Sequence, residues 1–95
     1  MDVTALLEER KEIDEADALM APLFVKHMAA VKKIAAFKAE YGMPIEDSAR
    51  EKAVLANAVL RLDDTELYKY YEAFLKSLMD ISKLYQHDLN GKENA

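Results

Sequence analysis

Cysteine is absent from the 95-residue sequence, and glycine and proline occur only twice each. Without cysteine the chain has no disulfide framework, no thiolate metal site and no cysteine nucleophile. Gly42 and Gly91 alone cannot form a phosphate-binding loop, which needs several closely spaced glycines. The shortage of turn residues also argues against an all-β protein.

Long apolar runs and an excess of positive charge are missing as well. The longest apolar run covers residues 18–25 and contains Pro22, whereas a membrane-spanning helix needs about 20 residues. Thirteen Lys and Arg against eighteen Asp and Glu leave a net charge of −5, which argues against a nucleic-acid binder with its basic face. The first residues lack the basic segment of a signal peptide, so we expect a cytoplasmic protein.

Helix-forming residues dominate what is present, chiefly Ala, Leu, Glu, Lys and Met. The sequence therefore predicts an all-α protein. Turn-forming residues gather at 42–48 and again at 63–65. They divide a single domain, residues 1–95, into helices at about 3–41, 48–62 and 65–89 and a frayed tail at 90–95. Ser48 and Glu51 fit a capping box at the second helix, and Asp64 fits the N-cap of the third.

The first predicted helix is long enough to raise the question of a partner. Its apolar residues keep the helical period on both sides of Pro22, which favours one helix bent near the proline over two separate helices. At ~1.5 Å per residue such a helix is nearly 60 Å long, against a radius of gyration of ~12 Å for a compact chain of this size. Two shorter helices cannot cover it. We therefore expect an obligate oligomer, most simply a twofold dimer.

Charge divides this first helix into two halves. Residues 1–17 hold seven acids and two bases, whereas residues 18–39 hold four lysines, His27 and no acid. The order complements the helix dipole. It also suits an antiparallel pair of first helices, in which the acidic half of one chain lies on the basic half of the other. The two interpretations are compatible.

Several polar residues occupy positions where the apolar stripes of the helices predict buried side chains. On the first helix, His27 and Lys38 lie in the apolar stripe and Arg10 lies at its margin. On the second helix, Glu51 lies on the stripe and Arg50 is next to it. On the third helix, Ser82 and Gln86 lie beside the stripe. A buried cationic cluster without acids calls for an anion. We therefore expect a pocket for a small organic polyanion.

Taken singly, these residues also have plainer interpretations. Lys38 reaches water from a helix end, His27 is a core residue, Arg10 pairs with Asp14, Glu51 completes the capping box, and Ser82 and Gln86 are surface polar residues. His27 and His87 are far apart in the sequence, and there is no HExxH motif, so we expect no metal site. No nucleophilic triad is indicated by spacing.

The sequence resembles the all-helical chorismate mutase family over nearly its whole length. The resemblance lies in three stretches: LLEERKEIDEADALM (6–20), VKKIAAFKAEYGMPIEDSARE (31–51) and FLKSLMDISKLYQ (74–86). It implies three-helix chains that intertwine into a homodimeric helical bundle. It also implies an isomerase that rearranges chorismate to prephenate, in the shikimate pathway towards phenylalanine and tyrosine.

The resemblance implies a role for each residue of the predicted site. Arg10 reaches the substrate of the partner chain, and Lys38 contacts a carboxylate and the ether oxygen. The ring hydroxyl is surrounded by Asp47, Arg50 and Glu51. The last helix contributes Ser82 and Gln86, and Gln86 faces the ether oxygen. The implied reaction, a [3,3] rearrangement within one dianionic substrate, uses no cofactor and no metal. Catalysis would rest on holding the reactive conformer and on donating to the ether oxygen.

One position departs from the family pattern. His27 stands where the family usually has an arginine that binds a substrate carboxylate. Arginine offers a permanently charged, bidentate fork that histidine lacks. The change is consistent with reduced activity, with a related substrate such as isochorismate or aminodeoxychorismate, or with a low-activity or engineered variant. Two further alternatives are an isochorismate pyruvate-lyase, which shares the fold, and a non-catalytic helical module for dimerisation or docking.

Overall fold

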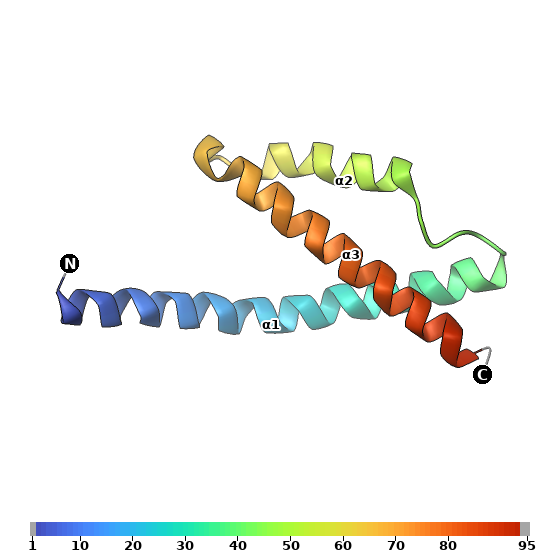
Figure 1. Cartoon of the computed structure of the whole chain (residues 1–95), viewed down its shortest axis with the longest axis horizontal. Coiled ribbons are helices and arrows are strands. Elements are labelled where there is room, and N and C mark those ends of the chain that lie inside the picture. The colour runs from blue at the N-terminus through green and yellow to red at the C-terminus, as the bar shows by residue number, and fades with distance from the viewer. Residues whose placement is uncertain (1, 94–95) are drawn as a thin grey trace. The chain divides into compact units, whose positions relative to one another are not determined.

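The computed structural model describes residues 2–93, whose regular structure is entirely helical. The elements follow one another as α1 (Val3–Glu40), α2 (Ser48–Arg61), the 3₁₀ turn η1 (Thr65–Leu67) and α3 (Tyr68–Glu93) (Figure 1). The all-α class, the three helices and the long first helix are therefore confirmed. The helices lie close to the predicted ranges because the residues that start and stop them act locally.

α1 passes through Pro22 as one uninterrupted helix of 38 residues. This agrees with the prediction of a single helix rather than two. The ribbon of the first 30 residues shows no sharp kink (Figure 1), so the bend expected at the proline is not seen. Pro22 is exposed, and water can therefore serve the backbone carbonyl that the missing proline N–H leaves without a partner.

The chain divides into two compact units, one ending at Ala30 and the other beginning at Val31. The described part of the first unit is helical from Val3 onward and contains no buried residue. Its large apolar side chains stay exposed, with Leu19 at 69% and Leu23 at 63%. Residues 2–30 thus have no core of their own. The interpretation of the whole chain as one domain remains a prediction.

The second unit holds the end of α1, the connecting loop, α2 and α3. Its apolar core is small and consists of Val31, Ala35, Ile45, Ala58 and Leu75. These residues come from α1, the loop, α2 and α3, so each segment contributes to one core. Figure 1 shows α2 and α3 as the two arms of a hairpin joined through η1.

A glycine ends α1 and turns the chain into the loop. Gly42 has φ of +64°, a left-handed conformation that glycine adopts without a Cβ clash. Met43 N–H donates to the carbonyl of Lys38 at 2.8 Å, and Gly42 N–H donates to the carbonyl of Ala39 at 3.5 Å. This pair of bonds is a Schellman motif. It fixes the direction in which the loop leaves the helix beside Lys38.

The start of α2 differs by one residue from the predicted cap. Asp47 is the N-cap, and its Oδ1 accepts from the backbone N–H of Arg50 at 3.0 Å. The predicted capping box of Ser48 with Glu51 is therefore wrong. Both Asp47 and Ser48 are good N-cap residues, and the loop after Gly42 delivers Asp47 first. Glu51 is left free to interact with another element.

The ends of α3 combine a confirmed cap with a longer helix than predicted. Asp64 caps as expected and accepts from the N–H of Glu66 at 2.9 Å, although it opens η1 and α3 itself begins at Tyr68. The helix continues to Glu93, so residues 90–93 of the predicted tail are helical, and residues 94–95 lie outside the described part. Gly91 does not stop the helix because glycine costs only about 1 kcal/mol there.

Length alone does not make α1 a membrane helix. It has 38 residues, but charged side chains recur along it. Among residues 2–93 no helix is both long and apolar enough to cross a bilayer. The expected cytoplasmic location remains a prediction.

Candidate active site

Most residues of the predicted site lie in the second unit. They are Lys38 on α1, Asp47 in the loop, Arg50 and Glu51 on α2, and Ser82 and Gln86 on α3. The other two, Arg10 and His27, lie on the part of α1 that belongs to the first unit.

Lys38 is the residue on which the connecting loop is anchored. Its side chain is half-buried, and Nζ donates to the backbone carbonyl of Ile45 at 2.9 Å. Its own carbonyl accepts from Met43 N–H. Within residues 2–93 Lys38 forms no ion pair. An ammonium has three N–H donors, so the carbonyl contact leaves the others for water or for an anion.

Ser82 and Gln86 are buried, with 8% and 6% of their surfaces exposed. Their interpretation as surface residues is therefore wrong. Ser82 Oγ donates to the carbonyl of Leu78 at 2.8 Å, and Gln86 Nε2 donates weakly to the carbonyl of Ser82 at 3.4 Å. Gln86 Oε1 is buried and has no hydrogen-bond partner among the described residues. A buried polar atom left unsatisfied costs about 1–3 kcal/mol, which favours a site that a ligand completes.

Glu51 is joined to α3 by an ion pair that the sequence did not reveal. Lys83 Nζ lies 2.8 Å from Glu51 Oε1, and the two side chains are only 28% and 32% exposed. The hydrogen bond to Glu51 raises the pKa of Lys83, with Asp80 at 3.5 Å adding to the effect. No spacing rule links residues on two different helices. Only the packing of α2 on α3 identifies Lys83 as a neighbour of the site.

Asp47 and Arg50 frame the start of α2. The carboxylate of Asp47 is engaged with the helix as its N-cap, and its residue is exposed. Arg50 is also exposed, and its guanidinium forms no ion pair within the described part of the chain. Arg50 is therefore available to a ligand, whereas Asp47 serves as the N-cap of α2.

A second tie between the loop and α3 was also missed from the sequence. His87 Nε2 and Glu46 Oε1 are 2.9 Å apart, and both side chains are more than half exposed. The hydrogen bond from His87 lowers the pKa of the Glu46 carboxyl below its ordinary 4.5. This contact holds the residue before Asp47 against the residue after Gln86.

Arg10 and His27 are both exposed in the single chain. Among the described residues, Arg10 forms no ion pair, so the predicted Arg10–Asp14 pair is absent. His27 is not the core residue of its plainer interpretation. Both side chains are thus available for contacts outside the chain.

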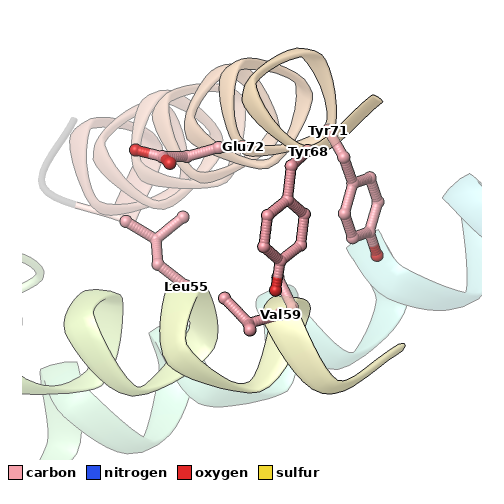
Figure 2. Close-up of a pocket in the computed structure, with 6 residues that line it drawn as sticks. Leu55, Val59, Tyr68, Tyr71 and Glu72 are labelled. Atoms are coloured by element: carbon pink, nitrogen blue, oxygen red, sulfur yellow. The ribbon is translucent and has the colours of Figure 1, made fainter. Parts of the chain in front are cut away.

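A pocket between α2 and α3 is separate from these residues. It is lined by Leu55, Ala58, Val59, Tyr68, Tyr71 and Glu72 and has about 30 Å³ of free volume. Figure 2 shows the ring of Tyr68 reaching from α3 to Val59 of α2, and its buried hydroxyl has no partner within residues 2–93. The space suits a water molecule or two rather than an organic substrate. None of the predicted site residues lines it.

Metal ligands do not gather in the described part of the chain. Across residues 2–93 no three His, Cys, Asp or Glu side chains are placed to hold a metal ion. The residues predicted for the site in the second unit are two cations, two carboxylates, a buried hydroxyl and a buried amide.

Comparison with known protein families gives a match over most of the chain. The sequence model of the family described as Chorismate mutase type II matches residues 9–87. That range contains every residue of the predicted site. No curated protein and no solved structure matches the chain.

Proposed function

We propose, because the chain belongs to the chorismate mutase type II family, that Lys38, Gln86 and Glu51 carry out its rearrangement of chorismate to prephenate. As a chorismate mutase the chain is an isomerase of aromatic biosynthesis. The reaction breaks a C–O ether bond and forms a C–C bond within one molecule, without proton transfer. An enzyme can accelerate it by holding the reactive conformer and by stabilising charge on the ether oxygen.

The open amide of Gln86 is the observation that carries this assignment. Gln86 is buried, yet one end of its amide has no partner among residues 2–93 and the other makes only a 3.4 Å contact. The amide nitrogen carries two N–H groups, and its one contact, with the Ser82 carbonyl, is long, so a small rotation of the side chain lets Nε2 donate to a ligand. Donation to the ether oxygen strengthens as that oxygen gains charge, which lowers the barrier rather than only tightening binding.

Lys38 supplies the charge at the same oxygen and at a carboxylate. Its ammonium has a carbonyl partner but no carboxylate partner within the described residues. Chorismate is a dianion, and its ether oxygen becomes more negative as the C–O bond breaks. A cation already held in place at that oxygen does not have to reorganise during the reaction.

The remaining residues of the second unit are assigned to substrate binding. Glu51 accepts from the ring hydroxyl with the carboxylate oxygen that does not face Lys83. Asp47 and Arg50 lie at the same helix start, and Ser82 lies one turn before Gln86 on α3. Arg50 contributes donors to the anion, and Ser82 can do so once its hydroxyl turns away from the Leu78 carbonyl, to which it donates in the free chain. Asp47 fixes the start of the helix that carries Glu51.

A second copy of the chain completes the site in this proposal. Apolar residues along the first unit, among them Leu19, Leu23 and Val25, are more than 60% exposed. Covering them in an intertwined homodimer removes apolar surface from water at about 25 cal/mol per Å². Each site then receives Arg10 from the other chain, while His27 takes the position of a carboxylate-binding arginine.

Because His27 replaces an arginine, a second reaction of the same fold is an alternative. An isochorismate pyruvate-lyase uses a substrate of the same charge as chorismate. A histidine at position 27, which binds a carboxylate more weakly than an arginine, is compatible with the lyase reaction as well as with the mutase reaction. A non-catalytic dimerisation module is the alternative of another kind, since it would use the same apolar stripes and would tolerate loss of the cationic residues.

The direct test follows the loss of chorismate absorbance with purified protein at about pH 6 and about pH 8, with product analysis. We expect prephenate at both values. Pyruvate and salicylate from isochorismate, with no prephenate from chorismate, would assign the lyase reaction instead. No turnover of either substrate by a folded dimer would favour the non-catalytic module.

A further inference from the structure

Lys83 lies within the arrangement proposed for catalysis although no role has been given to it. It follows Ser82 directly and precedes Gln86 by three residues, which places Lys83 and Gln86 on neighbouring positions of one helix face. From that face Lys83 reaches across to Glu51 on α2 at 2.8 Å. The ion pair therefore brings the carboxylate of Glu51 to the stretch of α3 that carries the buried amide.

A second lysine pair on α3 provides a comparison. Lys76 and Glu72 are 2.9 Å apart on consecutive turns, but their side chains are 58% and 53% exposed. The Lys83–Glu51 pair is about half as exposed, at 28% and 32%, and it joins two helices rather than two turns of one. Exposed pairs on one helix contribute little. A partly buried pair between helices fixes the direction of both side chains more firmly.

The charged groups around Lys83 show what the pair does. Glu51 faces it from α2, and Asp80 faces it from α3 at 3.5 Å with a side chain that is 77% exposed. Lys83 thus has an exposed acid on its own helix, yet its closest contact is the less exposed acid of α2. One oxygen of Glu51 is occupied by this contact, and the other remains to accept a hydrogen bond.

We propose that Lys83 is a positioning residue of the active site, which orients the carboxylate of Glu51 so that its second oxygen accepts from the ring hydroxyl of chorismate. The inference rests on the proposed function, in which Glu51 contacts that hydroxyl. Lys83 itself does not touch the reacting atoms. It acts by removing the freedom of a flexible glutamate, so that the substrate meets an acceptor already in place.

The test measures kcat and KM for chorismate in six proteins. They are wild type, Lys83→Met, Lys83→Arg, Glu51→Gln, the double variant Lys83→Met with Glu51→Gln, and the control Lys76→Met. Lys76→Met serves as a matched control, since it removes a lysine with a carboxylate partner from the same helix. We expect Lys83→Met to lower kcat/KM about tenfold, mainly through a higher KM. Lys83→Arg should recover most of the loss because it restores the ion pair. Lys76→Met should equal wild type.

The double variant separates positioning from other roles. If Lys83 acts through Glu51, adding Lys83→Met to Glu51→Gln lowers kcat/KM no further. A further tenfold loss in that background would overturn the proposal, as would an unchanged kcat/KM in folded Lys83→Met with only a lower melting temperature. If Lys83→Met does not fold, failure of Lys83→Arg to retain kcat/KM while its circular dichroism matches wild type overturns it equally.

Failure of this inference is distinguishable from failure of the proposed function. If kcat/KM falls strongly in Glu51→Gln but is unchanged in Lys83→Met, the role proposed for Lys83 is wrong and that of Glu51 stands. An unchanged kcat/KM in Glu51→Gln removes Glu51 from the proposed site and the inference with it.

Discussion

Lys38 holds the backbone carbonyl of Ile45 through its ammonium at 2.9 Å, and the two residues flank the turn that leaves α1. The lysine proposed to bind the substrate therefore also fixes the loop that leads to Asp47. A bound carboxylate could replace or share this carbonyl, because an ammonium has three donors. In the proposed site the same residue would therefore link the loop to the bound anion.

Replacing Lys38 should abolish most of the activity. We expect Lys38→Ala to lower kcat for chorismate by about a hundredfold or more, since removal of one preorganised donor to a developing charge has effects of this size. Circular dichroism and sedimentation should show a folded dimer. The control is Lys76→Ala, an exposed lysine on α3, which should keep wild-type turnover. A near-normal rate in Lys38→Ala would remove this lysine from the catalytic assignment.

Mixing two inactive variants should restore activity if Arg10 serves the partner's site. In a mixed dimer, the Arg10→Ala chain supplies an intact Lys38 and the Lys38→Ala chain supplies an intact Arg10, which together form one complete site. We expect the mixture, unfolded and refolded together, to recover a measurable share of wild-type kcat while each variant alone stays inactive. No recovery, despite mixed dimers seen by mass spectrometry, would place Arg10 in the site of its own chain.

Substituting His27 should strengthen the carboxylate clamp. A charge-assisted hydrogen bond contributes about 1.5–3 kcal/mol, so we expect His27→Arg to raise kcat/KM for chorismate about tenfold near neutral pH. Steady-state kinetics with chorismate near neutral pH measure the gain. A lower kcat/KM in the variant would mean that His27 serves a different substrate.

The contact between Glu46 and His87 should make the folding stability depend on pH in the acidic range. His87 lowers the pKa of Glu46 below 4.5, so the ionised carboxylate favours the folded state. That contribution is fully present above the unfolded value and is lost as the pH falls through the folded pKa. We expect Glu46→Gln to melt slightly below wild type at about pH 6, and we expect this difference to disappear as the pH falls through the lowered pKa of Glu46. His87→Gln should reproduce this pattern, and a constant difference at every pH would argue against the contact.

The two glycines allow a paired prediction, because alanine should lower the stability at Gly42 and raise it at Gly91. Gly42 has φ of +64° with open space around it, so Gly42→Ala adds only backbone strain and should cost about 1–2 kcal/mol. Gly91 is helical with nothing near its Cβ position, so Gly91→Ala should stabilise by up to about 1 kcal/mol. Urea unfolding at one fixed protein concentration measures both. Equal effects of the two substitutions would contradict the assigned turn.

Much of the helical framework could be predicted because its signals are local. The cap at Asp64 and the break at Gly42 each depend on residues within a turn of the helix end. Local signals also have limits where two candidates compete, as with Asp47 and Ser48. Gly91 shows the same limit, because a single glycine lowers helix propensity without ending the helix.

The candidate site could be predicted in part, for a related reason. Ser82 and Gln86 attracted notice because polar residues beside an apolar stripe are costly to bury, and the structure does bury them. Lys83 and His87 gave no comparable signal, since each reads as an ordinary polar residue on the surface of a helix. Their partners, Glu51 and Glu46, lie on segments remote in sequence.

The sequence by itself determined that this is a helical protein with a long first helix, because composition, periodicity and caps act over a few residues. It also marked Lys38 and Gln86, since a charge on an apolar stripe and an amide beside one are both costly to bury. Only the tertiary structure decided that Glu51 meets Lys83 and that one end of Gln86 stays open. The reason is physical: an ion pair or an unsatisfied atom depends on which helices pack together, and that packing brings together residues that no spacing along the chain relates.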